Sequence, residues 1–72
     1  MTYIIRGRAV NGGIWYLKGW DKKKPVWISE SKYLKGGIVQ EYARLDRLGE
    51  YIQRIRENDE RKWKSLIVVE VH

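Results

Sequence analysis

The strongest constraint on the fold is the turn sequence Asn11-Gly12-Gly13, which lies between two strand-like segments. Residues 3–10 and 14–20 on either side are rich in β-branched and aromatic residues, which favour β-strands. Asn-Gly readily adopts the positive φ angles that a tight hairpin turn requires. The sequence therefore predicts an antiparallel β-hairpin formed by these two segments.

Two further strands are expected. Residues 26–29 form a short third strand after the polar connection 21–25, where a proline bars a regular strand interior. Residues 30–37 contain serine and glycine and are interpreted as a connection. Residues 66–71 are apolar at consecutive positions, which is typical of a strand that is covered on both faces or paired centrally.

One amphipathic helix is expected before the last strand. Apolar residues recur at i, i+3, i+4 and i+7 from Leu48 to Ile55, so they share one face of a helix. Asp46 is suited to the N-cap position, although the apolar stripe extends back to Ile38 and allows an earlier start. The predicted fold is α+β in a single domain, residues 1–72. Its order is β-β-β-α-β, with one helix on one face of an antiparallel sheet of three to four strands.

Length and composition limit how this chain is stabilised and where it works. Seventy-two residues are near the lower limit for unaided folding, and the absence of Cys excludes disulfides and thiolate metal sites. Four Trp and five Tyr must supply much of the packing. No apolar run approaches the roughly 18 residues of a membrane span, and the N-terminal residues do not resemble a secretion signal. We expect a cytoplasmic protein with no membrane partner.

The net charge of +6 is concentrated in one half of the chain. Residues 1–35 hold eight basic and two acidic residues, whereas residues 36–72 hold seven of each. This asymmetry indicates an anionic partner that meets the N-terminal elements. Ordinary solubilising charge is the alternative explanation.

Side-chain alternation along the strands predicts an open, cationic face. Arg6 and Arg8 lie on the opposite face of the first strand from Ile5, and burying unpaired charges under a helix is costly, so the Ile5 side is the expected core. The same argument places Lys18 on the open side of the second strand, whereas alternation leaves Trp27 ambiguous. The predicted nucleic-acid-binding residues, including the lysines at the rim, are Arg6, Arg8, Tyr16, Lys18, Trp20, Lys22, Lys23, Lys24 and Trp27.

Cations interleaved with flat rings are typical of surfaces that bind DNA or RNA. Lys and Arg neutralise phosphates and release counterions, while aromatic rings stack on bases. Two alternatives remain open at this stage: the rings are half-buried sheet residues covered by the aliphatic stems of Arg6 and Lys18, or the surface binds a protein. A homodimer formed through Trp27 or an edge strand is a further alternative.

The residues that catalysis requires are missing from the sequence. His72 is the only histidine and is the last residue, where it is poorly suited to act as a positioned base. We find no zinc-ligand cluster, and neither glycine pair has the spacing of a phosphate-binding loop. We therefore expect a non-enzymatic protein with no cofactor and no metal.

Four segments resemble those of small uncharacterised phage-encoded proteins. They are the opening Tyr3-Ile4-Ile5-Arg6, Trp27, the segment Tyr42-Ala43-Arg44-Leu45 before the helix, and the closing run from Leu66 to Val71. The resemblance implies a bacterial host cytoplasm and an accessory role. Proteins of this kind often inhibit a host complex, as anti-CRISPR proteins do. Many of those are acidic mimics of nucleic acid, a route that the charge of +6 argues against.

Overall fold

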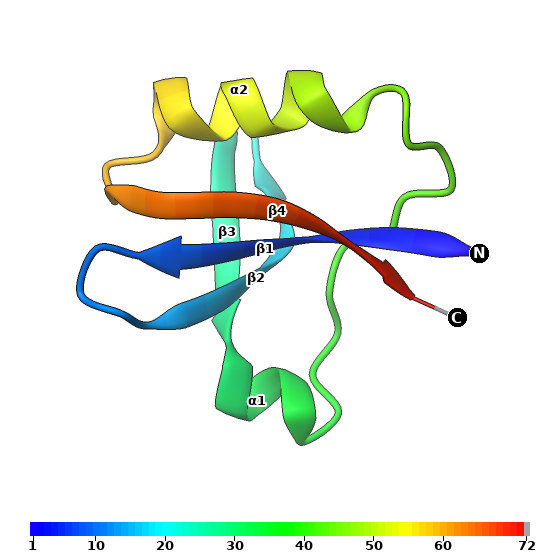
Figure 1. The fold of residues 1–72 in the computed structure, drawn as a ribbon, viewed down its shortest axis with the longest axis horizontal. Helices are drawn as coiled ribbons and strands as arrows, with labels where there is room; N and C mark the ends of the chain where they lie inside the picture. Colours follow the sequence, from blue (N-terminus) through cyan, green and yellow to red (C-terminus); the bar gives the residue numbers. More distant parts are fainter. Residues whose placement is uncertain (72) are drawn as a thin grey trace.

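In the computed structural model, which describes residues 1–71, one four-stranded antiparallel sheet is combined with two helices (Figure 1). In chain order, the elements are β1 (Thr2–Ala9), β2 (Ile14–Asp21), β3 (Lys24–Ser29), α1 (Glu30–Leu34), α2 (Leu48–Asn58) and β4 (Trp63–Val71). The strands are arranged in the order β3-β2-β1-β4. The α+β class and the order β-β-β-α-β are confirmed, and α1 is an additional element within the expected connection 30–37.

The predicted β1–β2 hairpin is present, and its turn explains why the sequence signal is strong. Gly12 has a φ of 94°, a conformation that favours glycine. The side-chain oxygen of Asn11 accepts a hydrogen bond of 3.0 Å from the backbone N–H of Gly13. Ala9 N–H donates across the turn to the Gly13 carbonyl over 2.8 Å. The turn is therefore defined by contacts among neighbouring residues.

The second hairpin, β2–β3, is tighter than the expected connection 21–25. Its turn lies at Lys22 and Lys23, and Lys22 has a positive φ of 58°. Pro25 lies inside β3 rather than before it, where it pairs with Trp20. β3 is an edge strand, and an edge strand tolerates proline where the missing N–H would point away from its neighbouring strand. The expectation that Pro25 would exclude a strand is therefore wrong.

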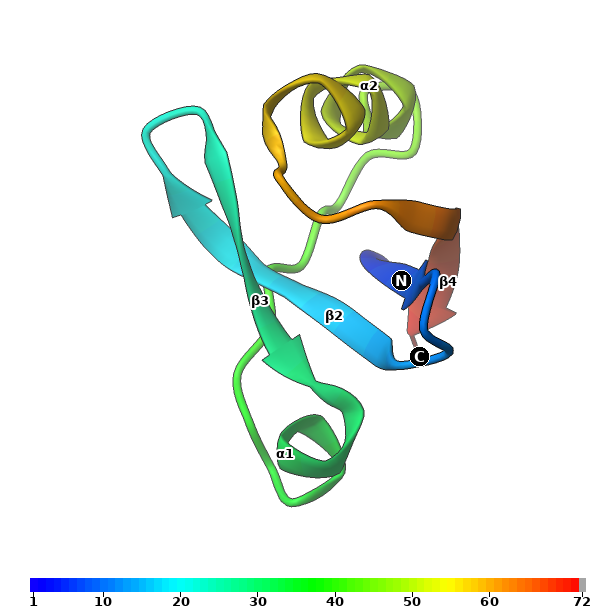
Figure 2. The ribbon, with the colours of Figure 1, turned by 90° about the vertical axis from the view of Figure 1, so that its left-hand side faces the viewer.

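The β2–β3 ribbon diverges from β1 and β4, and a loop segment fills the resulting gap (Figure 2). β1 pairs with β2 only at Arg6 to Arg8, whereas it pairs with β4 along its whole length. Beyond Arg6, Tyr3 and Tyr42 exchange two backbone hydrogen bonds of 2.8 Å. Gln40 N–H donates to the Leu17 carbonyl over 2.9 Å on the other side of the gap. The segment before α2 thus replaces the missing strand contacts.

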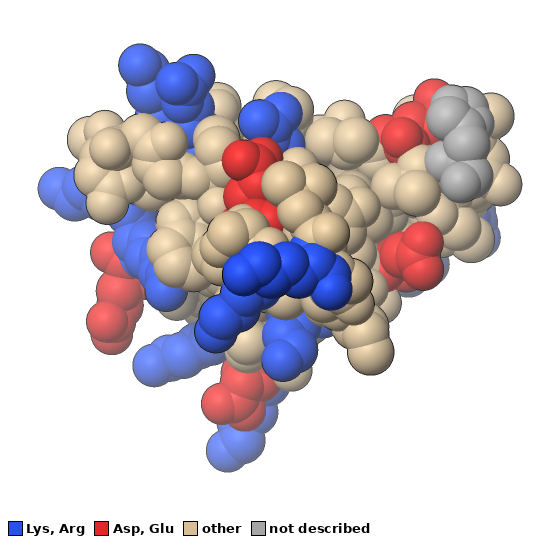
Figure 3. Space-filling model, turned by 90° about the horizontal axis from the view of Figure 1, so that it is seen from below, with Lys and Arg blue, Asp and Glu red and all other residues tan. Residues whose placement is uncertain are grey.

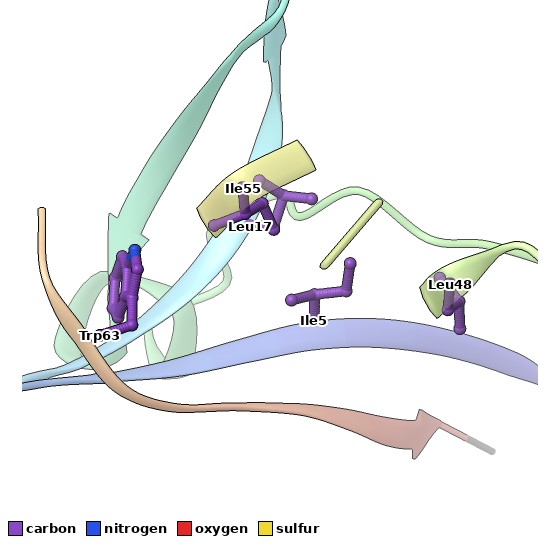
Figure 4. Packing of buried hydrophobic residues seen from close by; sticks show 5 residues of the cluster. All are labelled: Ile5, Leu17, Leu48, Ile55 and Trp63. Atoms are coloured by element: carbon purple, nitrogen blue, oxygen red, sulfur yellow. The ribbon is translucent and has the colours of Figure 1, made fainter. Parts of the chain in front are cut away.

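Helix α2 covers one face of the sheet, which we call the α2 face. The residues that form the buried cluster on this side are Ile5, Leu17, Leu48, Ile55 and Trp63 (Figure 4). The assignment of Ile5 to the core is confirmed. The helix begins at Leu48, with Arg47 at the N-cap position and no side-chain cap. Asp46 lies one residue before the N-cap position, and its carboxylate accepts hydrogen bonds of 2.9 and 3.2 Å from the guanidinium of Arg44.

The opposite side of the sheet, which we call the α1 face, is also partly covered. Ile4 is fully buried there, and the ring of Tyr33 from α1 lies over Tyr16 with 4.3 Å between ring centres. Gly37 packs so closely on Ile28 that a Cβ at this position would overlap that side chain. The sheet therefore has apolar contacts on both faces, although only the α2 face carries the main core.

The last strand, β4, lies at an edge of the sheet, so of the two alternatives for its apolar run the central pairing is wrong. Leu66 and Val68 pack against the α2-face core. On the other side Val69 is half-buried, whereas Ile67 is 46% exposed. The run of apolar residues therefore reflects two incompletely covered faces rather than a central position.

Candidate nucleic-acid interface

The structure separates the cations from the aromatic rings that the sequence pattern placed together. Tyr16 does lie on the same face as Arg6, because the two residues are direct partners in the β1–β2 pairing. However, Tyr16 is only 9% exposed, since Tyr33 of α1 covers its ring. The expectation of an exposed Tyr16 is wrong because α1 was not recognised in the sequence.

Trp20 lies on the α2 face rather than on the open face. The β2–β3 register shifts between Leu17 and Gly19, so one extra residue interrupts the alternation. Leu17 and Trp20 consequently point to the same side of the sheet. The indole N–H of Trp20 donates to the hydroxyl of Tyr42 over 2.9 Å, and the guanidinium of Arg54 lies 5.5 Å from its ring centre. The expectation of Trp20 on the open face is therefore wrong.

Trp27 is also directed into the protein. It pairs with the buried Leu17, and its ring centre lies 4.3 Å from that of Trp63. The indole N–H groups of Trp27 and Trp63 both donate to one carboxylate oxygen of Asp59, at 2.7 and 2.9 Å. These bonds hold β3, α2 and β4 together, so the expectation of Trp27 on the open face is wrong.

Arg6 and Arg8 remain on the α1 face and line a hollow of about 370 Å³. Its other walls include Ile14, Ser65 and Ile67. Arg8 is exposed, whereas Arg6 lies 3.9 Å from the carboxylate of Glu30. The Nε atom of Arg6 is buried and has no hydrogen-bond partner among residues 1–71. The two arginines thus stay together, and of the predicted rings only Tyr16, which Tyr33 covers, lies beside them.

The lysines of the expected site lie on the β2–β3 ribbon. Lys18 is exposed within the bulge of β2. Lys22, Lys23 and Lys24 are exposed at the turn, where they border a hollow of about 530 Å³ that also includes Asn58 at the end of α2. The predicted set is therefore divided between the ribbon and the Arg6–Arg8 hollow.

Most cations of the molecule are free of internal ion pairs. Within residues 1–71, the ion pairs are Arg6–Glu30 and Arg44–Asp46, so thirteen of the fifteen Lys and Arg residues form none. Figure 3, which views the side of α1, shows Lys and Arg atoms across much of this face, with fewer acidic atoms among them. The surface therefore offers unpaired positive charge in several places.

Sequence reasoning missed two groups of cations. Lys32 and Lys35 lie on and directly after α1, a helix whose capping signal is Ser29: its hydroxyl accepts a 3.4 Å hydrogen bond from Lys32 N–H. Arg61 and Lys62 border a hollow of about 580 Å³ beside Trp15, and Arg61 lies 4.3 Å from the centre of that ring. The serine before an acidic residue was the available signal for α1. No local signal places Arg61 over Trp15.

The two partly buried phenols provide a test of the structure by pH. Burial raises the pKa of Tyr16 above 10.0, opposed by Arg6, and burial raises that of Tyr42, opposed by the Trp20 hydrogen bond. In the unfolded chain both phenols ionise near the ordinary value. The folded state therefore retains these two protons to higher pH than the unfolded chain does. The stability that they contribute below pH 10 is lost as the pH rises through the pKa values of the folded state.

We expect the urea concentration at the unfolding midpoint to decrease as the pH rises beyond 10, and part of the phenolate absorbance to develop at higher pH than that of an ordinary tyrosine. Tyr16→Phe and Tyr42→Phe should each remove some of this late absorbance. Titration curves of both variants that overlay the wild type would contradict the assignment.

Several other kinds of site were sought in the part of the chain that the structure describes. No group of three or more His, Asp or Glu side chains gathers there as metal ligands. Neither helix within residues 1–71 is long and apolar enough to cross a membrane. No protein-family model, curated protein or solved structure matches this chain.

Proposed function

We propose that this protein is a non-enzymatic module that binds nucleic acid through the backbone phosphates, using the basic β2–β3 ribbon. The observation that carries the proposal is the set of exposed lysines on this ribbon, which have no ion pair among residues 1–71: Lys18, Lys22, Lys23 and Lys24. Asp21 is the acidic residue of the same hairpin. The ribbon therefore presents a local excess of positive charge.

The shape of the ribbon supports contact with a duplex. The turn between β2 and β3 extends to one side of the molecule, away from β1 and β4 (Figure 2). The major groove of B-DNA admits a two-stranded β-ribbon. The flexible side chains of the lysines carry compact charges that can reach the phosphates on both sides of a groove. Because Tyr16, Trp20 and Trp27 are packed internally, binding relies on charge rather than on base stacking.

The proposal extends to the cellular setting of the protein. The resemblance to small phage-encoded proteins favours an accessory protein that acts in the cytoplasm of a bacterial host. A charge-based interface predicts weak sequence preference, because phosphate contacts carry no base information. DNA and RNA duplexes are both candidate ligands. The major groove of duplex RNA is too narrow to admit the ribbon in the same way.

Titration of the protein with labelled DNA duplex, RNA duplex and single strands tests the proposal. Between about 50 mM and about 300 mM salt, log K should fall linearly with log salt concentration, with a slope of about −0.9 for each phosphate contacted in B-DNA. DNA duplex should bind more tightly than RNA duplex. Absence of binding at the lowest salt concentration would reject the function.

A matched pair of variants tests the location of the interface. Lys22→Gln, Lys23→Gln and Lys24→Gln together should weaken binding about 10- to 100-fold and reduce the salt slope by up to about 3. The control combines Arg8→Gln, Lys35→Gln and Arg47→Gln, which removes the same net charge from exposed positions outside the ribbon. We expect this control to retain most of the affinity and slope. An equal loss in both variants would reject the ribbon as the interface.

A further inference from the structure

The outer edge of β4 is a long, unprotected strand edge. β4 spans nine residues and has β1 as its neighbouring strand, with no other element beside it (Figure 2). Within residues 1–71, no backbone hydrogen bond outside the β1–β4 ladder involves residues 64–71. Long edge strands are commonly shielded because they pair readily with other chains. β4 has one extra residue at Lys64, where the β1–β4 register shifts, but among residues 1–71 no proline or covering loop shields the regular stretch from Ser65 to Val71.

The sequence of β4 is complementary to itself in one antiparallel register. Pairing centred on Ile67 places Glu70 opposite Lys64 of a second copy, and Lys64 opposite Glu70, with Lys64 at the bulge where the regular part of β4 begins. Both side chains are exposed, and neither forms an ion pair among the described residues. Ile67, which is 46% exposed, lies opposite its own counterpart. A centre at Val68 would instead place Glu70 opposite Leu66.

We propose that this protein forms a two-fold symmetric homodimer in which two β4 strands pair antiparallel about Ile67. The contact joins two four-stranded sheets into one continuous sheet, and it uses the same patch on both subunits, as two-fold symmetry requires. Opposite charges facing each other across a strand pair stabilise it, whereas like charges destabilise it. The proposal is independent of nucleic-acid binding.

The dimer would also extend a site already described. Ser65 and Ile67 line the hollow that contains Arg6 and Arg8, and all four residues lie on the α1 face. Pairing at Ile67 therefore brings the hollows of the two subunits next to each other. The combined surface contains four arginines, two from each subunit.

Cysteine cross-linking tests the register directly, because the chain has no native Cys. Residues directly opposite each other in an antiparallel pair have Cα atoms about 4.5–5.5 Å apart, which suits a disulfide. Ile67→Cys should therefore give a disulfide-linked dimer under mild oxidation. Val71→Cys is the control on the same strand, because the two copies would lie about 27 Å apart, at about 3.3 Å per residue. Equal cross-linking of both variants, or none of Ile67→Cys, would overturn the proposal.

Charge exchange tests the same interface without a covalent bond. Sedimentation from about 1 μM to about 500 μM protein, without nucleic acid, should show a dimer whose population rises with concentration. Lys64→Glu and Glu70→Lys should each weaken dimerisation at least about tenfold, because like charges then face each other twice. The double variant should restore it to within about threefold. Far-ultraviolet circular dichroism checks that each variant is folded.

The remaining outcomes each reject the proposal. A wild-type protein that stays monomeric over the whole concentration range has no such interface. A dimer that is insensitive to both charge changes uses another surface. Because these measurements contain no nucleic acid, their failure is distinct from a failure of the ribbon to bind DNA.

Discussion

Asp59→Ala should destabilise the protein by about 2–4 kcal/mol, because one carboxylate oxygen accepts the indole N–H of two tryptophans. Hydrogen bonds to charged groups contribute about 1.5–3 kcal/mol each, and they are not additive when they share an acceptor. The other oxygen of Asp59 accepts a 3.0 Å hydrogen bond from the backbone N–H of Arg61. The substitution would therefore leave partly buried donors in Trp27 and Trp63 without a partner and loosen the turn before β4.

Tryptophan fluorescence during urea unfolding measures this effect, since both rings report on the packing between β3 and β4. Asp59→Asn is the matched control, because it keeps an oxygen acceptor and removes the charge. We expect its loss to be smaller than that of alanine. A midpoint for Asp59→Ala equal to that of the wild type would show that Trp27 and Trp63 are held by packing alone.

Ile55→Ala should cost about 2–5 kcal/mol, which is the range for removing a fully buried aliphatic side chain. Ile55 has 0% exposure and brings α2 against Leu17 and Trp63 in the core cluster (Figure 4). Alanine favours a helix slightly more than isoleucine does, so the loss arises from the cavity and lost contacts. A domain of this size has only a few kcal/mol of stability, and we expect the variant to be largely unfolded at room temperature.

The graded variant Ile55→Val keeps this prediction measurable, with an expected loss of about 0.5–1.5 kcal/mol. Ile67→Ala is the control for a partly exposed isoleucine and should change the free energy of unfolding of the monomer much less. Circular dichroism and urea unfolding at low protein concentration provide the comparison. Equal losses for Ile55→Ala and Ile67→Ala would contradict the position of the core.

The candidate site could be predicted only in part, and one residue accounts for much of the difference. Alternation correctly separated Ile5 from Arg6 on β1, because a lone arginine is costly to bury and the strand is regular. On β2 the same rule failed after Leu17, where the bulge at Lys18 turned Trp20 toward α2. Gly19 was the available local signal, because an isolated glycine within a strand often marks a bulge. Period-two counting that ignores a bulge carries its error to every later position.

The sequence by itself determined the elements whose causes are local. The Asn11-Gly12 turn, the apolar spacing of α2 and the free lysines of the ribbon follow from a few neighbouring residues and hold in the folded protein. Only the tertiary structure decided which rings are exposed, because the packing of Tyr33 on Tyr16 and the hydrogen bond from Trp27 to Asp59 join separate segments of the chain. The edge position of β4 is of the same kind, since strand order depends on which ladders form and not on any single strand's composition.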